Sequence, residues 1–124
     1  QQAEWKPTVS LQLNSESHKV GEDLYETVLT VTVTVKSSET TAYLVEVKQA
    51  GLFILKGFDD NNRAGLLGSY CPNVLFPFAR EVIADHVVKG GFPQLLLEPI
   101  NFDALYAQHR QQAQQNAPAT DTPQ

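Results

Sequence analysis

The segment Tyr25–Val35 alternates between two sets of side chains with a period of two residues, and it constrains the fold more than any other feature of the chain. A period of two is that of a β-strand, and the β-branched residues in both sets suit a pleated surface. The chain must therefore build a sheet, and both of its faces need cover. One predicted face carries Tyr25, Leu29, Val31, Val33 and Val35, and the other carries Glu26, Val28, Thr30, Thr32 and Thr34.

Two further segments, Thr8–Asn14 and Thr41–Lys56, alternate in the same way and are predicted to be strands. The connections are short and polar: Ser15–Glu22, with Gly21 as its turn residue, and Lys36–Thr40. Strands joined in this way form an antiparallel meander. In the third strand, one predicted face carries Tyr43, Val45, Val47, Phe53 and Leu55, and the other carries Leu44, Glu46, Lys48, Leu52 and Ile54.

A helix is predicted to begin near Pro77, because a proline in the first turn loses no hydrogen bond. Pro72 and Pro77 disfavour the α region in the residue before them, so Cys71–Phe76 is expected to be irregular. Gly90-Gly91 is expected to end the helix. The spacing of three and four residues predicts one apolar stripe, formed by Ala79, Val82, Ile83, His86 and Val87.

Phe78 and Val88 lie off this stripe, so the helix has apolar residues on more than one side. Such a helix packs against two surfaces, which we expect to be the sheet beneath it and a second subunit above it. The predicted strands also indicate a second subunit, because both faces of their sheet need cover. One domain with few helices cannot cover both, which leaves roughly a few hundred square ångströms of surplus apolar surface. We therefore predict a symmetric homo-oligomer.

Three short elements complete the prediction. Asn62 can cap a helix over Arg63–Leu67. Leu95–Leu97 is a continuous apolar run between two prolines, which favours a short covered strand. Asn101 can cap a final helix over Phe102–Gln112.

The length of 124 residues suits one α+β domain over residues 1–112, followed by a disordered polar tail over 113–124. The net charge is −5 with only nine lysines and arginines, so neither nucleic acid nor an anionic membrane is expected as a partner. Cys71 is the single cysteine, which suits a reducing cytoplasm. No apolar run reaches the roughly 18 residues of a membrane span and no signal peptide heads the chain, so no membrane insertion is expected.

Three patterns in the sequence could carry chemistry. Cys71 could be a nucleophile with His86 as its base, but neither lies in a motif. Asp85 could exchange a proton with His86, but neighbouring residues of a helix point in different directions. Asp59 and Asp60 lack the alternating spacing of a calcium loop, and the three histidines are too far apart for a metal site. We therefore predict no catalytic residue, no metal and no cofactor.

Several long motifs in this chain closely resemble SecB, the export chaperone family of proteobacteria. They are CPNVLFPFARE, the segment GGFPQLLLEPINFDALY, the segment AYLVEV followed by QAGLF, and Trp5 near the start. The resemblance covers Trp5 to Tyr106. It implies a four-stranded antiparallel sheet, with a long helix and a C-terminal helix packed on it, in a homotetramer built as a dimer of dimers. The family carries an acidic strand before the tryptophan that is missing here.

The resemblance also implies a function. Members of the family are ATP-independent holdases that bind unfolded precursor proteins in surface grooves and deliver them to the cytoplasmic translocation ATPase SecA. Leu44 and Glu46 match the SecA-docking positions, of which the missing strand would carry a part. Val45, Val47 and Gln49 match positions at subunit contacts. The positions expected near the client groove are Trp5, Tyr43, Phe53, Phe76, Phe78 and Tyr106.

Two alternatives stay open. A SecB-like chaperone can serve a toxin–antitoxin system instead of export, and the neighbouring gene would separate the two roles. A small enzyme centred on Cys71 or His86 belongs to a different class. Replacing Cys71 by serine without loss of activity would exclude it.

Overall fold

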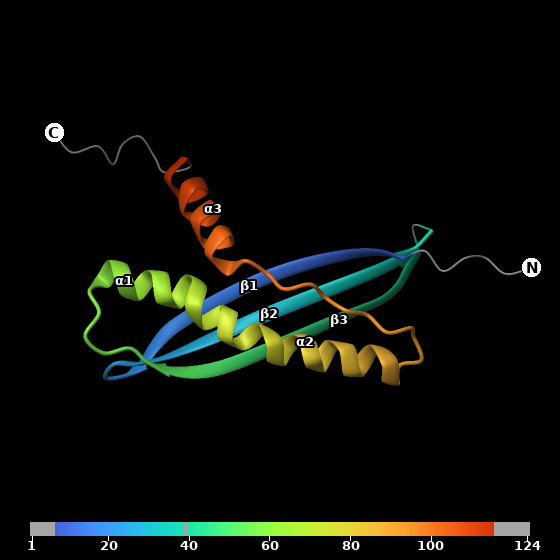
Figure 1. The fold of residues 1–124 in the computed structure, drawn as a ribbon, viewed down its shortest axis with the longest axis horizontal. Coiled ribbons are helices and arrows are strands. Elements are labelled where there is room, and N and C mark those ends of the chain that lie inside the picture. Colours follow the sequence, from blue (N-terminus) through green and yellow to red (C-terminus); the bar gives the residue numbers. More distant parts are fainter. Residues whose placement is uncertain (1–6, 39, 116–124) are drawn as a thin grey trace, which may run out of the picture.

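The fold is α+β, as predicted, with a sheet that is covered on one face by a layer of helices (Figure 1). The computed structural model describes residues 7–38 and 40–115. The strands are β1 Thr8–Gly21, β2 Leu24–Ser37 and β3 Thr40–Ile54. The helices are α1 Asp60–Gly65, the π-helix η1 Leu66–Tyr70, α2 Cys71–Lys89 and α3 Phe102–Gln115.

The sheet is an antiparallel meander in the order β1-β2-β3, which confirms the predicted pairing of the three strands. Val31 pairs with Leu13 on one side and with Val47 on the other, so an apolar column crosses the face beneath the helices. We call this the inner face. The alternation of β2 is confirmed as well, because its inner side chains are buried and its outer ones are half-buried.

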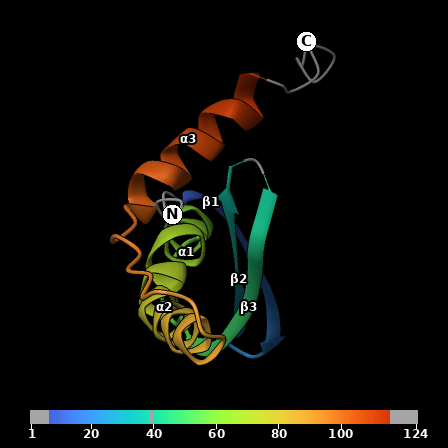
Figure 2. The same ribbon diagram turned by 90° about the vertical axis from the view of Figure 1, so that its right-hand side faces the viewer.

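The described residues form three strands, so the prediction of a four-stranded sheet is wrong for them. Leu95–Leu97, the predicted extra strand, lies in an irregular segment without strand pairing. This segment returns beside α2 within the helical layer and not in the plane of the sheet, so it does not extend the sheet (Figure 2). Leu95 and Leu97 still pack against the core, as a covered apolar run should.

β1 is longer than predicted, because most of Ser15–Glu22 continues the strand as far as Gly21. Its exposed polar side chains suit an edge strand that carries few core residues. On the inner face, Ser17 Oγ lies 2.7 Å from Thr27 Oγ1, a hydrogen bond that joins β1 to β2. The turn follows Gly21 and places Asp23 in the left-handed region, with φ 57°.

α2 begins at Cys71, so the expectation of an irregular Cys71–Phe76 and of a start near Pro77 is wrong. α1 and η1 precede α2 without a break, and the helical backbone is continuous over all three elements. Pro72 takes the first-turn position that the sequence pattern assigned to Pro77. Pro77 lies inside the helix, where it removes one backbone hydrogen bond. The acceptor that loses this donor is the carbonyl of Asn73, an exposed residue.

The helix ends follow the predicted capping chemistry with one exception. Asp59 caps α1 in place of Asn62, since its Oδ1 accepts a hydrogen bond from the Asn62 N–H at 2.7 Å. The stop at Gly90-Gly91 is confirmed, because Gly91 adopts a left-handed φ of 89°. The cap of α3 is confirmed as well, with Asn101 Oδ1 accepting from the Ala104 N–H at 3.0 Å.

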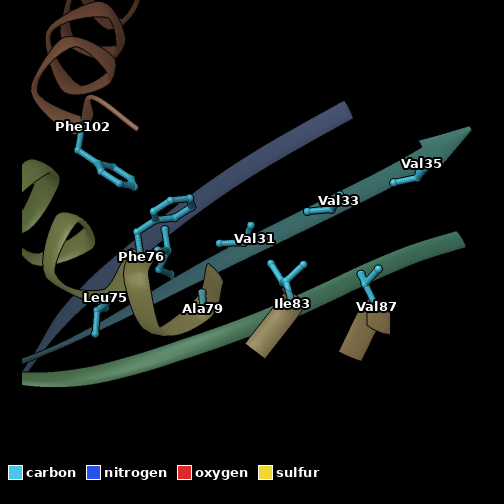
Figure 3. Packing of buried hydrophobic residues seen from close by; sticks show 10 residues of the cluster. Val31, Val33, Val35, Leu75, Phe76, Ala79, Ile83, Val87 and Phe102 are labelled. Carbon is cyan, nitrogen blue, oxygen red and sulfur yellow. The ribbon is translucent and has the colours of Figure 1, made fainter. Parts of the chain in front are cut away.

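The core lies between the inner face of β2 and one side of α2 (Figure 3). Ala79, Ile83 and Val87 are buried there as predicted. Val82 and His86 were predicted on the same stripe but are exposed, because each lies one residue before the buried Ile83 or Val87 and is therefore turned about 100° away from the core on the helix. Fully burying one large apolar side chain is worth about 1.5–3 kcal/mol. The buried cluster consists of Leu29, Val31, Val33, Val35, Leu75, Phe76, Ala79, Ile83, Val87 and Phe102.

α3 ends at Gln115, so the first residues of the predicted tail, 113–115, are helical. The rest of that tail and Trp5 lie outside the described residues. Within residues 7–38 and 40–115, no helix is both long and apolar enough to span a membrane.

Candidate functional site

An open apolar pocket of about 850 Å³ lies between the inner side of β1, η1 and α3. We call it the α3 pocket. Its floor is formed by Leu11 and Leu13 of β1 and by Leu29 of β2. The full lining consists of Leu11, Leu13, Asn14, Ser15, Leu29, Gly68, Pro72, Phe102, Leu105, Tyr106, Gln108, His109, Arg110 and Gln112.

The first turns of α3 form one wall of the α3 pocket, and they are held against η1. Ser69 Oγ donates a hydrogen bond to Asp103 Oδ1, which joins the two helices. One turn further along, the Tyr106 ring lies directly against Gly68, where a Cβ atom would overlap it. A glycine at this position therefore permits the close approach of α3. Phe102 anchors the start of α3 in the core, 5.7 Å from the Phe76 ring in an edge-on contact.

The rim of the α3 pocket is polar and basic. His109 and Arg110 lie on it, and the Arg110 guanidinium carbon sits 5.8 Å from the centre of the Tyr106 ring. An apolar floor under a polar rim holds apolar side chains of a ligand while its backbone stays near water. No carboxylate is among the described residues that line this pocket.

A second, smaller groove of about 520 Å³ lies between α2 and the returning segment. We call it the α2 groove. Its lining is Pro77, Arg80, Glu81 and Ala84 of α2 together with Leu95–Leu97. The Arg80 guanidinium carbon is 5.7 Å from the centre of the Phe76 ring, which holds this cation against the core. The carboxylate of Glu81 has no ion-pair partner among the described residues.

The residues expected near the client groove do not meet in one place. Only Tyr106 lines the α3 pocket. Phe76 is a core residue, and Phe78 is 56% exposed on the opposite side of α2. Tyr43 and Phe53 share the inner face of β3, where the Tyr43 ring lies 4.5 Å from Phe92. The sixth expected residue, Trp5, lies outside the described residues.

Several residues of the α3 pocket were not among the predicted ones. The alternation of Thr8–Asn14 already placed Leu11 and Leu13 on one face, so that signal was available. Gly68 and Leu105 carried no signal of their own, because their role depends on the contact between η1 and α3.

The alternation of β3 is confirmed, and it separates the two predicted sets of contact residues. Leu44 is 59% exposed on the outer face, and beside it the Glu46 carboxylate accepts a hydrogen bond from Thr32 Oγ1 at 3.2 Å. The other set, Val45, Val47 and Gln49, is half-buried on the inner face. Val45 and Val47 pack against the core of their own chain.

The residues weighed as catalytic are not arranged for catalysis. Cys71 is fully buried, and burial raises the pKa of its thiol, which a hydrogen bond with Thr27 only partly offsets. A protonated thiol is a poor nucleophile. His86 lies exposed near the other end of α2, and at 1.5 Å of rise per residue the two backbones are roughly 20 Å apart.

The carboxylates weighed as calcium ligands are occupied within the chain. Asp59 caps α1, and Asp60 forms an ion pair with Arg63. Across residues 7–38 and 40–115, no three histidine, cysteine or acidic side chains come together as metal ligands would. The described surface therefore offers two places for apolar binding, the α3 pocket and the α2 groove.

Comparison with known proteins points to one family. Residues 1–113 match the family model described as preprotein translocase subunit SecB. The chain is 59% identical over 114 residues to the protein-export protein SecB of Nitrosococcus oceani, covering 92% of this chain and 70% of that protein. It is 60% identical over 119 residues to the protein-export protein SecB of Alcanivorax borkumensis, covering 94% of this chain and 76% of that protein.

Among solved structures, the fold is similar to that of a SecB-like chaperone from Mycobacterium tuberculosis in complex with an antitoxin peptide. The TM-score is 0.58, and the match covers 81% of this chain and 75% of the other chain. The sequences are 13% identical, so this likeness shows a shared fold alone.

Proposed function

Because the chain belongs to the SecB family of protein-export chaperones, we propose that the α3 pocket is where it binds apolar segments of unfolded precursor proteins. One observation carries this assignment: the pocket is apolar, open and about 850 Å³ in volume, which suits a large side chain and its neighbours. The side chains of Tyr106 and Leu105 form one wall of the pocket. An aromatic ring and a leucine side chain can contact precursor segments of many different sequences.

Holding a precursor in this way is a binding equilibrium that needs neither ATP nor a catalytic residue. A chaperone that binds only the unfolded chain lowers the concentration that can fold or aggregate. Several weak contacts along one long client add up to a useful affinity without sequence specificity. We infer that the chain is not an enzyme, since buried Cys71 and distant His86 supply no reactive pair.

We further propose that the outer face at Leu44 and Glu46 docks the translocation ATPase SecA. Both side chains are exposed and lie on the face opposite the helices, so a docked partner leaves the α3 pocket free. A precursor meets this ATPase before it crosses the membrane, so the proposal includes a cytoplasmic location for the chain.

Assembly into a homotetramer is part of the same proposal. Phe78, Val82 and Val88 are exposed on α2, and a second subunit would cover them. Val45, Val47 and Gln49 lie beneath the helical layer of their own chain, so they would act on assembly by positioning that layer. The likeness to a chaperone seen with an antitoxin peptide is a likeness of fold, and no residue in the α3 pocket favours that alternative.

Two matched variants test the assignment of the two surfaces. Leu105→Glu places a charge in the α3 pocket, and Leu44→Glu places the same charge on the outer face. We expect Leu105→Glu to weaken binding of a reduced, unfolded precursor roughly tenfold or more, as measured by light scattering and titration. Leu44→Glu should retain the precursor and lose SecA. Precursor binding that is unchanged in Leu105→Glu would contradict the assignment of the pocket.

A further inference from the structure

A row of threonines runs along the middle of the outer face of the sheet. No described helix covers this face (Figure 2). The row belongs to β2, and its three half-buried members are Thr30, Thr32 and Thr34. In the antiparallel register, their partners on β3 are Lys48, Glu46 and Leu44 in the same order. The row therefore lies beside the two residues that are proposed to dock SecA.

The three threonines differ in what their hydroxyl groups contact. Thr32 Oγ1 lies 3.2 Å from Glu46 Oε2. An ionised carboxylate can only accept, so the hydroxyl of Thr32 is the donor. Neither Thr30 nor Thr34 forms a side-chain hydrogen bond within the part of the chain that the structure describes. Of this row, Thr32 alone holds a charged group.

The carboxylate of Glu46 is not neutralised by its own chain. No cation pairs with it in residues 7–38 and 40–115, although Lys48 is exposed two positions along the same face. The bond from Thr32 uses Oε2, and Oε1 accepts no hydrogen bond from any described group. The second oxygen is therefore available to a lysine or arginine of a partner.

The bond restrains a side chain that is otherwise free to rotate. An exposed glutamate loses rotamer entropy when a partner fixes it in one conformation. Thr32 is branched at Cβ and has a stiff χ1, so its hydroxyl is a fixed donor beside Glu46. Arranging a contact before binding raises affinity, because less entropy is lost on binding. At 3.2 Å the bond is longer than the usual range of about 2.5–3.0 Å, so it favours one orientation without locking it.

From these observations we propose that Thr32 is a positioning residue for the docking of SecA, because its hydroxyl orients the Glu46 carboxylate toward a basic side chain of that partner. The inference rests on the proposed docking at Leu44 and Glu46, and it adds the chemistry of the contact. Leu44, beside Glu46 on the same face, is 59% exposed and supplies an apolar contact. The segment of SecA that docks here therefore carries a lysine or arginine next to an apolar side chain.

The threonine row supplies its own matched controls. Thr32→Val removes the donor and keeps the shape of the side chain, and Thr32→Ser keeps a hydroxyl. Thr30→Val makes the same change at a position whose partner on β3 is Lys48. We expect Thr32→Val to weaken binding of SecA to the full chain roughly threefold to fivefold in a calorimetric titration, because one preorganising hydrogen bond is lost. Thr32→Ser and Thr30→Val should bind SecA as the unmodified chain does.

A double-mutant cycle with Glu46→Ala separates orientation of the carboxylate from other effects. Glu46→Ala should weaken binding of SecA more than Thr32→Val does. In that background, Thr32→Val should have no further effect, because the group that it positions is gone. Salt gives a second signature. Glu46→Ala should reduce the loss of affinity with rising salt, whereas Thr32→Val keeps the charge and should keep this dependence.

Two measurements exclude a merely structural role for Thr32. Thr32→Val and Thr30→Val should have the same urea midpoint, because both exchange a half-buried threonine on the same face of β2. Both should also bind a reduced, unfolded precursor as the unmodified chain does, because the α3 pocket lies on the other side of the sheet.

The outcomes separate this inference from the proposed docking. If Glu46→Ala weakens binding of SecA and Thr32→Val does not, Thr32 is not a positioning residue and the proposed docking stands. An equal loss from Thr32→Val with and without Glu46 would also overturn the inference, since its effect would not pass through the carboxylate. If Leu44→Glu and Glu46→Ala both bind SecA as the unmodified chain does, the proposed docking is wrong, and the inference is wrong with it.

Discussion

α2 and α3 belong to the same helical layer, but they are held in opposite ways. α2 lies along the sheet and buries a continuous side against it, including Leu75, Phe76 and Ile83. α3 buries Phe102 alone among its described side chains and then projects away from the sheet (Figure 2). Its remaining attachment is to η1, through Asp103 and Tyr106.

This difference separates the part of the molecule that determines stability from the part that shapes the site. Removing a core contact of α2 takes away buried area and leaves a cavity, both of which are costly. Moving α3 exposes little, because most of its surface already faces water. A pocket with one weakly attached wall can change its width at a small free-energy cost.

The largest expected effect is on the α2 side and uses a matched pair of phenylalanines. Phe76→Ala should lower the free energy of unfolding by about 3–5 kcal/mol, because Phe76 is 2% exposed and contacts Phe102. Phe78→Ala, on the exposed side of the same helix, should change it by less than about 0.5 kcal/mol in the isolated subunit. Urea unfolding at low protein concentration measures both. Equal losses would show that α2 is not anchored on one side.

The next effect concerns the contact between Gly68 and Tyr106, on the α3 side. Gly68→Ala should displace the start of α3 and weaken binding of an unfolded precursor roughly tenfold, because the new Cβ meets the Tyr106 ring. In a Tyr106→Ala background the ring is absent, so the same substitution should stabilise η1 by up to about 1 kcal/mol through helix propensity.

A double-mutant cycle over these two positions measures their coupling. We expect a coupling free energy of about 1–2 kcal/mol in unfolding experiments, since a Cβ atom at position 68 would overlap the Tyr106 ring. Additive effects of Gly68→Ala and Tyr106→Ala would mean that the position of α3 does not depend on this contact, and the contrast with α2 would lose its basis.

The same contrast marks the limit of what the sequence reveals. The alternation of Tyr25–Val35 predicted β2 and its buried face, because a period of two depends only on neighbours along the strand. Leu44 and Val45 were assigned to opposite faces for the same reason. These are local patterns, and the structure confirms them.

The remaining features depend on contacts between distant segments. Pro72 and Pro77 predicted irregular backbone, but continuous packing of α2 on the sheet stabilises the helix through both of them. The α3 pocket escaped prediction because Gly68 and Ser69 acquire a role only when α3 docks on η1. The aromatic residues expected near the client groove were assigned by the resemblance to the SecB family. Of those that the structure describes, only Tyr106 lines the α3 pocket.

A smaller effect is expected from the hydrogen bond between Ser69 and Asp103. Ser69→Ala should lower the free energy of docking α3 by about 1 kcal/mol, because Asp103 is exposed and water replaces part of the bond. Exchange of the α3 amides should accelerate several-fold while the amides of β2 stay unchanged. Ser10→Ala, an exposed serine on the outer face, serves as the control. Acceleration in β2 as well would mean that α3 and the core open together.

The smallest effect is a pH dependence that belongs to the α2 side of the comparison. Burial raises the pKa of the Cys71 thiol and also that of the Tyr43 hydroxyl. In each case the group loses its proton at a lower pH in the unfolded chain than in the folded chain. Above the pKa that the group has in the unfolded chain, the unfolded state therefore binds fewer protons than the folded state. The free energy of unfolding should therefore be unaffected below about pH 8 and should fall as the pH rises toward about 10.

Cys71→Ala should flatten this fall, and Tyr43→Phe should remove the contribution of Tyr43 while keeping its ring near Phe92. Ser69→Ala should leave the slope unchanged, because it acts on the docking of α3 and leaves both titrating groups in place. A slope that persists in the double variant of Cys71 and Tyr43 would assign the pH dependence to other groups.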